Sequence, residues 1–118
     1  MITSMTKYNA TRTTIDGHKF DSKKEAAYYC ELRLRKMAKE FADFSLQPEF
    51  ILLDPFTDAT GKKHRANKYR ADFAITHHDG TVEVVDVKAA KNFTTDVYKI
   101  KKKLFLARYP EYKFTEVT

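Results

Sequence analysis

The chain has 118 residues, of which 42% are hydrophobic and 32% are charged, so it is long enough for one domain with a single core. Its apolar runs are too short for a transmembrane helix, and its start lacks the signal-peptide pattern, so we expect a cytoplasmic protein. Cys30 is the only cysteine, which excludes an intramolecular disulfide. A net charge of +6 favours a polyanionic partner.

The first half of the chain predicts a leader, a hairpin and a helix within one domain spanning residues 1–118. Residues 1–10 form a polar leader, and the Asp16-Gly17 pair favours a tight two-residue turn in a hairpin over residues 11–20. A helix follows over residues 21–41, with Ser22 as its cap. Its expected apolar stripe consists of Ala26, Tyr29, Cys30, Leu34, Met37 and Phe41.

Three strands are expected next. The first covers residues 44–53, with Pro48 at an edge, a bulge or a bend, and a loop separates it from a second strand over residues 65–76. The turn "HHDG" then leads directly into a third strand over residues 81–89. The second and third strands are therefore expected to be antiparallel neighbours.

The last third of the chain predicts a helix over residues 96–109 and a strand over residues 112–117. The expected apolar stripe of this helix consists of Val97, Ile100, Leu104 and Ala107. The order of helix, three strands, helix and strand predicts an α/β fold with a mixed central sheet and a helix on each side.

The third strand, "TVEVVDVKAA", carries charges among its valines. Because side chains alternate along a strand, Asp86 and Lys88 share one face, whereas Glu83 points to the other. Asp72 lies in the neighbouring strand, so two carboxylates and a lysine can converge. Such a carboxylate pair suits Mg²⁺ or Mn²⁺, and the lysine could act electrostatically or as a base. The alternative is a structural Asp–Lys pair at a strand end.

Glu25 has two interpretations. The spacing Ser22-x-x-Glu25 fits a capping box, in which the glutamate bonds back to the start of its helix. A carboxylate on a helix that faces the sheet could instead reach a metal or orient its water. The two roles are hardly compatible, and the local sequence favours the cap.

Two acid-free basic clusters flank the charged strand and could be either solvated faces or a phosphate-binding surface. The candidate DNA-binding residues in them are Lys62, Lys63, Arg65, Lys68, Arg70, Lys99, Lys101, Lys102 and Lys103.

The blocks "FDSKKEAAYYCELRL", "LQPEFILL", "YRADFAI", "VVDVKAA" and "KIKKKLFLARYPEYKFTEV" resemble those of a small phage-encoded family of uncharacterised proteins, over roughly residues 13–117. That family is placed in the PD-(D/E)XK nuclease superfamily and is often described as an endodeoxyribonuclease. The resemblance implies a restriction-endonuclease-like αβββαβ core. It also implies hydrolysis of DNA phosphodiester bonds, with Holliday junctions or other branched DNA as candidate substrates.

The resemblance also implies roles for particular residues. Asp72 and Asp86 would hold Mg²⁺, for which Mn²⁺ would substitute, with the Val87 carbonyl as a further candidate ligand. Lys88 matches the motif lysine, although Ala71 replaces the usual proline before Asp72.

Outside those two motifs, Glu25 matches a glutamate near the metal on the first helix of resolvases and transposon-end nucleases. Gln47 matches a glutamine-proline element. No organic cofactor is implied. DNA is the expected partner, and cutting both strands symmetrically would require a homodimer. The rival interpretations are a non-catalytic nucleic-acid-binding module of phage replication, recombination or packaging, and a phage protein that binds another protein.

Overall fold

A computed structural model of the protein describes residues 12–89 and 94–118. The expected polar leader, residues 1–10, lies outside the described residues. The elements in chain order are β1 (Thr13–Ile15), β2 (His18–Phe20), α1 (Lys23–Met37), β3 (Asp43–Leu46), β4 (Glu49–Leu53), β5 (Phe56–Thr57), β6 (Lys63–His64), β7 (Asn67–Arg70), β8 (Phe73–Thr76), β9 (Val82–Val87), α2 (Asp96–Arg108) and β10 (Lys113–Val117). In the part of the chain that the structure describes, no helix has the length and apolar character needed to cross a membrane.

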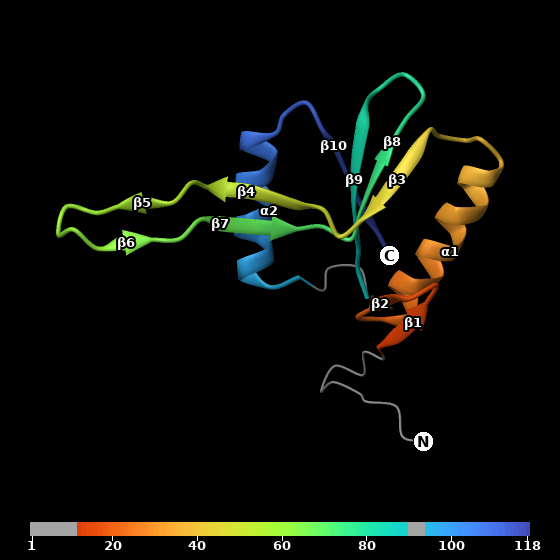
Figure 1. The fold of residues 1–118 in the computed structure, drawn as a ribbon, viewed down its shortest axis with the longest axis horizontal. Helices are drawn as coiled ribbons and strands as arrows, with labels where there is room; N and C mark the ends of the chain where they lie inside the picture. Colours follow the sequence, from red (N-terminus) through yellow and green to blue (C-terminus); the bar gives the residue numbers. More distant parts are fainter. Residues whose placement is uncertain (1–11, 90–93) are drawn as a thin grey trace.

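The centre of the molecule is a four-stranded sheet in the order β10-β9-β8-β3. The β9–β10 pair is parallel, whereas β8 pairs antiparallel with both β9 and β3, so the sheet is mixed. Helices α1 and α2 lie on opposite sides of this sheet (Figure 1). The predicted α/β class with a mixed sheet is therefore confirmed.

Each face of the sheet contributes to a separate hydrophobic cluster. Val85 packs into the α1-side cluster with Phe20, Leu32 and Phe73. Its neighbour Val84 packs into the α2-side cluster, which includes Phe105. Adjacent residues of a strand point to opposite faces, which explains why one strand anchors both helices.

Both predicted apolar stripes are wrong in part. In α1, Leu34 is 67% and Met37 75% exposed, whereas Leu32, outside the stripe, is fully buried. In α2, the expected stripe residues Val97, Ile100 and Leu104 are exposed, and the buried residue is Phe105. The buried face of α1 instead includes a carboxylate, Glu25, and the α2 face that meets the sheet is aromatic. The apolar pattern therefore identifies part of the buried face of α1, through Ala26 and Tyr29, and misses that of α2.

The first two predicted strands each break in the middle, and they break side by side. The break falls at Gln47 in one strand and at Asp72 in the other, and the backbone N–H of Gln47 donates to the Asp72 carbonyl at 2.9 Å. Gln47 has a φ of 49°, in the left-handed region, and is followed by Pro48, so the bend expected near this proline is present. Beyond the break, β4 and β7 form their own antiparallel pair, which lies against α2.

The segment predicted to be a loop folds as a hairpin that projects from the body (Figure 1). We call residues 54–66 the arm; it consists of the antiparallel strands β5 and β6 and their turn. Asp58 holds the turn, because its Oδ1 accepts from the backbone N–H groups of Thr60 and Lys62 at 2.9 and 3.1 Å. The other Asp58 oxygen lies 2.8 Å from His64 Nε2. The arm continues the β4–β7 pair away from the sheet.

The predicted N-terminal hairpin is confirmed. Strands β1 and β2 pair antiparallel on either side of a two-residue turn, in which Asp16 and Gly17 have φ values of 55° and 80°. Positive φ at both positions is what the Asp-Gly pair favours. The hairpin places Phe20 in the α1-side core.

Candidate active site

Asp86 is a buried acid on β9, on the face of the sheet that α2 covers. The hydroxyl of Tyr69, from β7, donates to Asp86 Oδ2 at 2.6 Å, and Lys88 Nζ lies 3.4 Å from the same oxygen. Burial and the adjacent carboxylate raise the pKa of the Tyr69 hydroxyl, so this group remains a donor at neutral pH. The predicted proximity of Asp86 and Lys88 is thus observed.

Asp72 lies at the break between β7 and β8, beside Asp86. Its Oδ2 accepts from the backbone N–H of Val87 at 2.6 Å, and its carboxyl group lies beside that of Asp86. Burial, followed by the negative charges of Asp86 and Glu25, raises the pKa of Asp72 to about 8. Two largely buried carboxyl groups in contact retain a proton near neutral pH unless a cation replaces it.

Glu25 approaches the pair from the opposite side of the sheet, on the first turn of α1. Its backbone N–H donates to Ser22 Oγ at 3.1 Å, so the serine cap is present. Its carboxylate is buried, with the Gln47 side chain and the Asp21 backbone nearby. Burial, and then the charge of Asp21, raises the pKa of Glu25. The serine half of the predicted capping box is therefore present, while the Glu25 carboxylate lies near Asp72.

Lys88 follows the end of β9 and is held on two sides. Besides the contact with Asp86, its ammonium lies 3.0 Å from the centroid of the Tyr98 ring on α2, a cation–π contact. The Tyr98 hydroxyl donates to Glu116 Oε2 at 2.6 Å, which fixes the ring. The lysine side chain is only 14% exposed. Its position is therefore defined by an acid and an aromatic ring.

The donors present can be compared with what a divalent cation requires. Within residues 12–89 and 94–118, no three His, Cys, Asp or Glu side chains are grouped so that they could hold a metal ion, so Glu25 lies beside the carboxylate pair without completing a three-acid site. Asp72 and Asp86 nevertheless form a largely buried oxygen pair in contact. One or two carboxylates with water molecules are the common way in which proteins hold Mg²⁺. The pair fits Mg²⁺ or Mn²⁺ on these grounds.

The two basic clusters differ in their surroundings. The cations of the first cluster lie on β6, β7 and their flanks, all are exposed, and no ion pair involves them within the described ranges: Lys62, Lys63, Arg65, Lys68 and Arg70. The second cluster lies on α2, where Lys102 pairs with Glu116 at 3.1 Å. Lys99 and Lys103 are exposed, and Lys101 lines a small apolar groove. The first cluster is the better candidate for phosphate contacts.

Glu83, on the same strand as Asp86, points to the opposite face, as the alternation predicts. Its carboxylate accepts from the Thr115 hydroxyl at 2.6 Å and lies 2.9 Å from His77 Nε2. His78, the other histidine of the turn, lies 2.8 Å from the Lys39 carbonyl. These groups support the turn and the sheet, and they have no contact with the carboxylate pair.

Tyr69 and Tyr98 belong to the site, although sequence reasoning does not identify them. Tyr69 precedes Asp72 by three residues, and only the break in the strand brings its hydroxyl to Asp86. Tyr98 lies in a helix whose sequence pattern is dominated by lysines. A signal is present in both cases, because a tyrosine that is buried or partly buried is expected to find a partner for its hydroxyl.

Comparisons with known proteins identify a family but no activity. No curated protein matches the chain, and no solved structure matches it. Residues 5–118 match the family described as "Protein of unknown function (DUF1064)", and this range covers the carboxylate pair, Lys88 and the arm. The chain therefore belongs to the DUF1064 family.

Proposed function

We propose that this protein is a metal-dependent endodeoxyribonuclease that hydrolyses DNA phosphodiester bonds. The observation that carries the proposal is the largely buried, adjacent Asp72–Asp86 pair: Asp72 accepts from the Val87 N–H, Asp86 accepts from the Tyr69 hydroxyl, and the Lys88 ammonium lies 3.4 Å from Asp86. A stable core has no need for two acids in contact, because their mutual repulsion opposes ionisation. A cation held by the two acids would account for their adjacency, and a lysine that binds the substrate phosphate would account for the position of Lys88.

In this proposal each residue has a defined task. A divalent cation held by Asp72 and Asp86 would supply a Lewis acid for the attacking water and the scissile phosphate. The Val87 N–H and the Tyr69 hydroxyl orient the two carboxylates through hydrogen bonds of 2.6 Å. Lys88, placed by the Tyr98 ring, would stabilise the negative charge that develops on the phosphate.

Glu25 and Gln47 form the outer part of the site. The Gln47 side chain lies near the Glu25 carboxylate, which is buried close to Asp72. From this position Glu25 would orient a water molecule next to the cation. The Val87 carbonyl remains a proposed further ligand.

We also propose that the fold is a restriction-endonuclease-like core. Its support is the succession of α1, the strands β3, β8 and β9, then α2 and β10, with β10 parallel to β9. The bend that separates β3 from β4 and β8 from β7 places Asp72 where the sheet ends. The β4–β7 pair and the arm would be additions to that core.

The substrate would be DNA, with branched molecules such as four-way junctions as candidates. One chain has one carboxylate pair, so cutting both strands symmetrically would require a homodimer, whereas a single copy would produce a nick. The proposed location is the cytoplasm, in the host cell if the protein is phage-encoded.

The second candidate function is a nucleic-acid-binding module without catalysis. The observation that favours it is the set of five exposed cations on the arm and β7, which have no acidic partner in the described part of the chain. Such a module would bind DNA backbone with steep salt dependence whether or not a metal is present. It would leave the carboxylate pair without a role.

The test is cleavage of labelled duplex, flap and four-way-junction DNA with Mg²⁺, Mn²⁺ or chelator. We expect the wild type to cut at least one substrate only when a divalent cation is present. Asp86→Asn should abolish cutting, and Lys88→Ala should slow it by about 10²–10³-fold, the usual effect of removing a group that stabilises transition-state charge.

Glu83→Gln is the matched control, because it changes an acid on the same strand but on the face away from the pair. It should cut at the wild-type rate. Cutting in chelator, or undiminished cutting by Asp86→Asn, would refute the proposed site. Binding without cutting on all three substrates would favour the module. Nicked rather than linear plasmid products would indicate that a single copy acts.

A further inference from the structure

We propose that the arm is a duplex-DNA grip: a two-stranded ribbon that lies in the major groove of the B-form DNA flanking the cleavage point and contacts phosphates on both sides. This inference rests on the proposed function, in that it places the substrate duplex on the arm side of the carboxylate pair. It adds a contact region and a preference for one form of nucleic acid.

The arm lacks a core of its own. Strands β5 and β6 pair only with each other and project from the body (Figure 1). An isolated two-stranded hairpin is marginally stable in water. Here its turn is held by Asp58, which bonds Thr60, Lys62 and His64. The arm is thus a formed ribbon that is exposed to solvent, which suits an element that contacts a partner.

The arm and its base carry an uncompensated positive charge. Of the two acids between residues 54 and 66, Asp58 is used in the turn and Asp54 pairs with Arg108 of α2 at 3.1 Å. The basic residues have no such partners within residues 12–89 and 94–118. Three Lys and Arg residues against two acids give the arm a net charge of +1, and Lys68 and Arg70 at its base raise it to +3. A polyanion is the partner that this charge selects.

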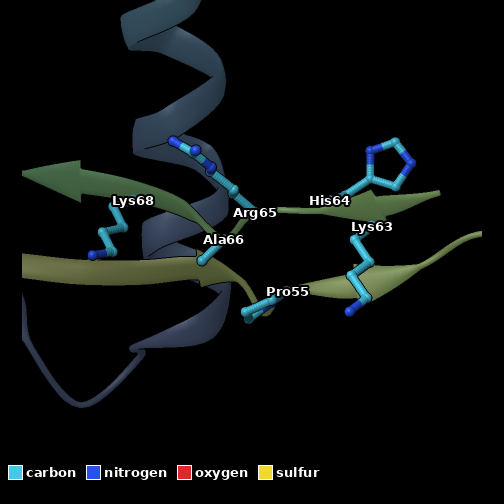
Figure 2. Close-up of a pocket in the computed structure, with 6 residues that line it drawn as sticks. All are labelled: Pro55, Lys63, His64, Arg65, Ala66 and Lys68. Carbon is cyan, nitrogen blue, oxygen red and sulfur yellow. The ribbon is translucent and has the colours of Figure 1, made fainter.

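The basic side chains of the arm and its base point in more than one direction. In the view of Figure 2 the side chains of Lys63 and Lys68 point one way and those of His64 and Arg65 the other. All four line an open groove of about 650 Å³. A flat surface that docks on a single phosphate strand would need its cations on one face. A ribbon that enters a groove meets phosphates on both sides.

The dimensions of the arm favour B-form DNA. The major groove of B-DNA is about 12 Å wide and admits a two-stranded β-ribbon, whereas the corresponding groove of double-stranded RNA is too narrow for side chains to enter. Twelve residues separate Thr60, in the turn, from Asp72, so the extended chain reaches at most about 40 Å, or about 12 base pairs. The arm would therefore contact duplex beyond the cleavage point.

An aromatic pair occupies one face of the arm. Phe56 is 45% exposed and stacks on His64, with ring centroids 4.6 Å apart and planes 14° from parallel. In a groove, this apolar surface would meet base edges and thymine methyl groups. On a single strand, it would instead offer a platform for stacked bases, so the experiment has to separate the two forms.

The experiment measures DNA binding in chelator, in the Asp86→Asn background, so that its outcome does not depend on cleavage. The arm variant combines Lys62→Gln, Lys63→Gln and Arg65→Gln. The control variant combines Lys19→Gln, Lys39→Gln and Lys113→Gln, which removes the same charge from exposed positions elsewhere. Both are compared on duplex DNA of about 30 and about 10 base pairs, on RNA duplex and on single-stranded DNA, with the salt dependence of each affinity.

We expect the arm variant to bind the longer DNA duplex at least about tenfold more weakly than the control variant. The slope of log affinity against log salt concentration should be shallower by up to about 2.7, which is about 0.9 for each of three phosphate contacts. The difference should be smaller on the short duplex, on RNA and on single-stranded DNA. Equal affinities of the two variants for the long duplex would overturn the inference, as would an equal loss on all four probes.

Phe56→Ala provides an independent readout, because it changes no charge. A loss of single-strand binding with unchanged duplex binding would also overturn the groove model. In the remaining alternative, the arm joins two copies of the chain, and light scattering of both charge variants checks it. A change of mass in the arm variant alone, without an effect on DNA binding, would refute the inference. Failure of the wild type to cut DNA would refute the nuclease proposal and leave these binding results intact.

Discussion

At the scale of single residues, the candidate site is defined by hydrogen bonds that hold acids together in a largely buried position. The alternation of side chains along β9 correctly separates Asp86 from Glu83. It does not show that Tyr69 reaches Asp86 or that Tyr98 holds Lys88, because both contacts depend on the strand break and on the rotation of α2. Contacts between side chains from separate elements are set by packing, which a local pattern does not encode.

The raised pKa of Asp72 predicts how the stability of the metal-free protein depends on pH. The folded state retains a proton on Asp72 up to about pH 8, whereas the unfolded chain releases it near the ordinary value of 3.8. The unfolding free energy should therefore fall as pH rises between these values. Asp72→Asn removes this titration. In chelator, the unfolding free energy of the variant relative to that of the wild type should therefore rise by at least about 1 kcal/mol, or roughly 4 °C in melting temperature, between about pH 5 and pH 9.

Thermal melts across this range, with Glu111→Gln as an exposed-acid control, provide the measurement. The control should follow the wild type at every pH. Parallel curves for the wild type and Asp72→Asn would show that Asp72 does not retain its proton in the folded protein. Saturating Mg²⁺ at the upper end of the range should remove the wild-type deficit, because the cation replaces the proton.

At the scale of elements, the sequence predicts which segments are helices or strands better than it predicts which face of a helix is buried. Both long helices, the hairpin at Asp16-Gly17 and the strand β9 lie close to their expected positions. The predicted stripe of α1 contains the buried Tyr29 but misses Leu32 and Glu25, the latter because an apolar count leaves out an acid. A buried acid therefore obscures the buried face of this helix in the sequence pattern.

The burial of Leu32 and the exposure of Leu34 predict the energetics of α1. Leu32→Ala should lower the unfolding free energy by about 2–5 kcal/mol, because it opens a cavity in the α1-side core. Leu34→Ala, at a position that is 67% exposed, should change it by about 0.5 kcal/mol or less. Chemical denaturation of the two variants measures both values. A larger loss for Leu34→Ala would mean that the helix faces the core as its sequence pattern suggests.

At the scale of the whole molecule, a bend shared by two strand pairs relates the site to the surface that would bind DNA. Gln47 and Asp72 are joined at this bend by a backbone hydrogen bond. On one side of it lie the central sheet and its two helices, and on the other the β4–β7 pair and the arm. Only Pro48 indicates the bend in the sequence, since the break at Asp72 contains neither proline nor glycine. The carboxylate pair lies where the compact body meets the basic ribbon.

The central claim is that Asp72 and Asp86 together hold a divalent cation, and binding of Mn²⁺ to the full chain tests it most directly. Titration by calorimetry or by the electron paramagnetic resonance signal of free Mn²⁺ should reveal a site in the wild type and in the Glu111→Gln control. The same site should be lost in both Asp72→Asn and Asp86→Asn. Absence of Mn²⁺ binding by the wild type, or unchanged binding in the two variants, would contradict the account.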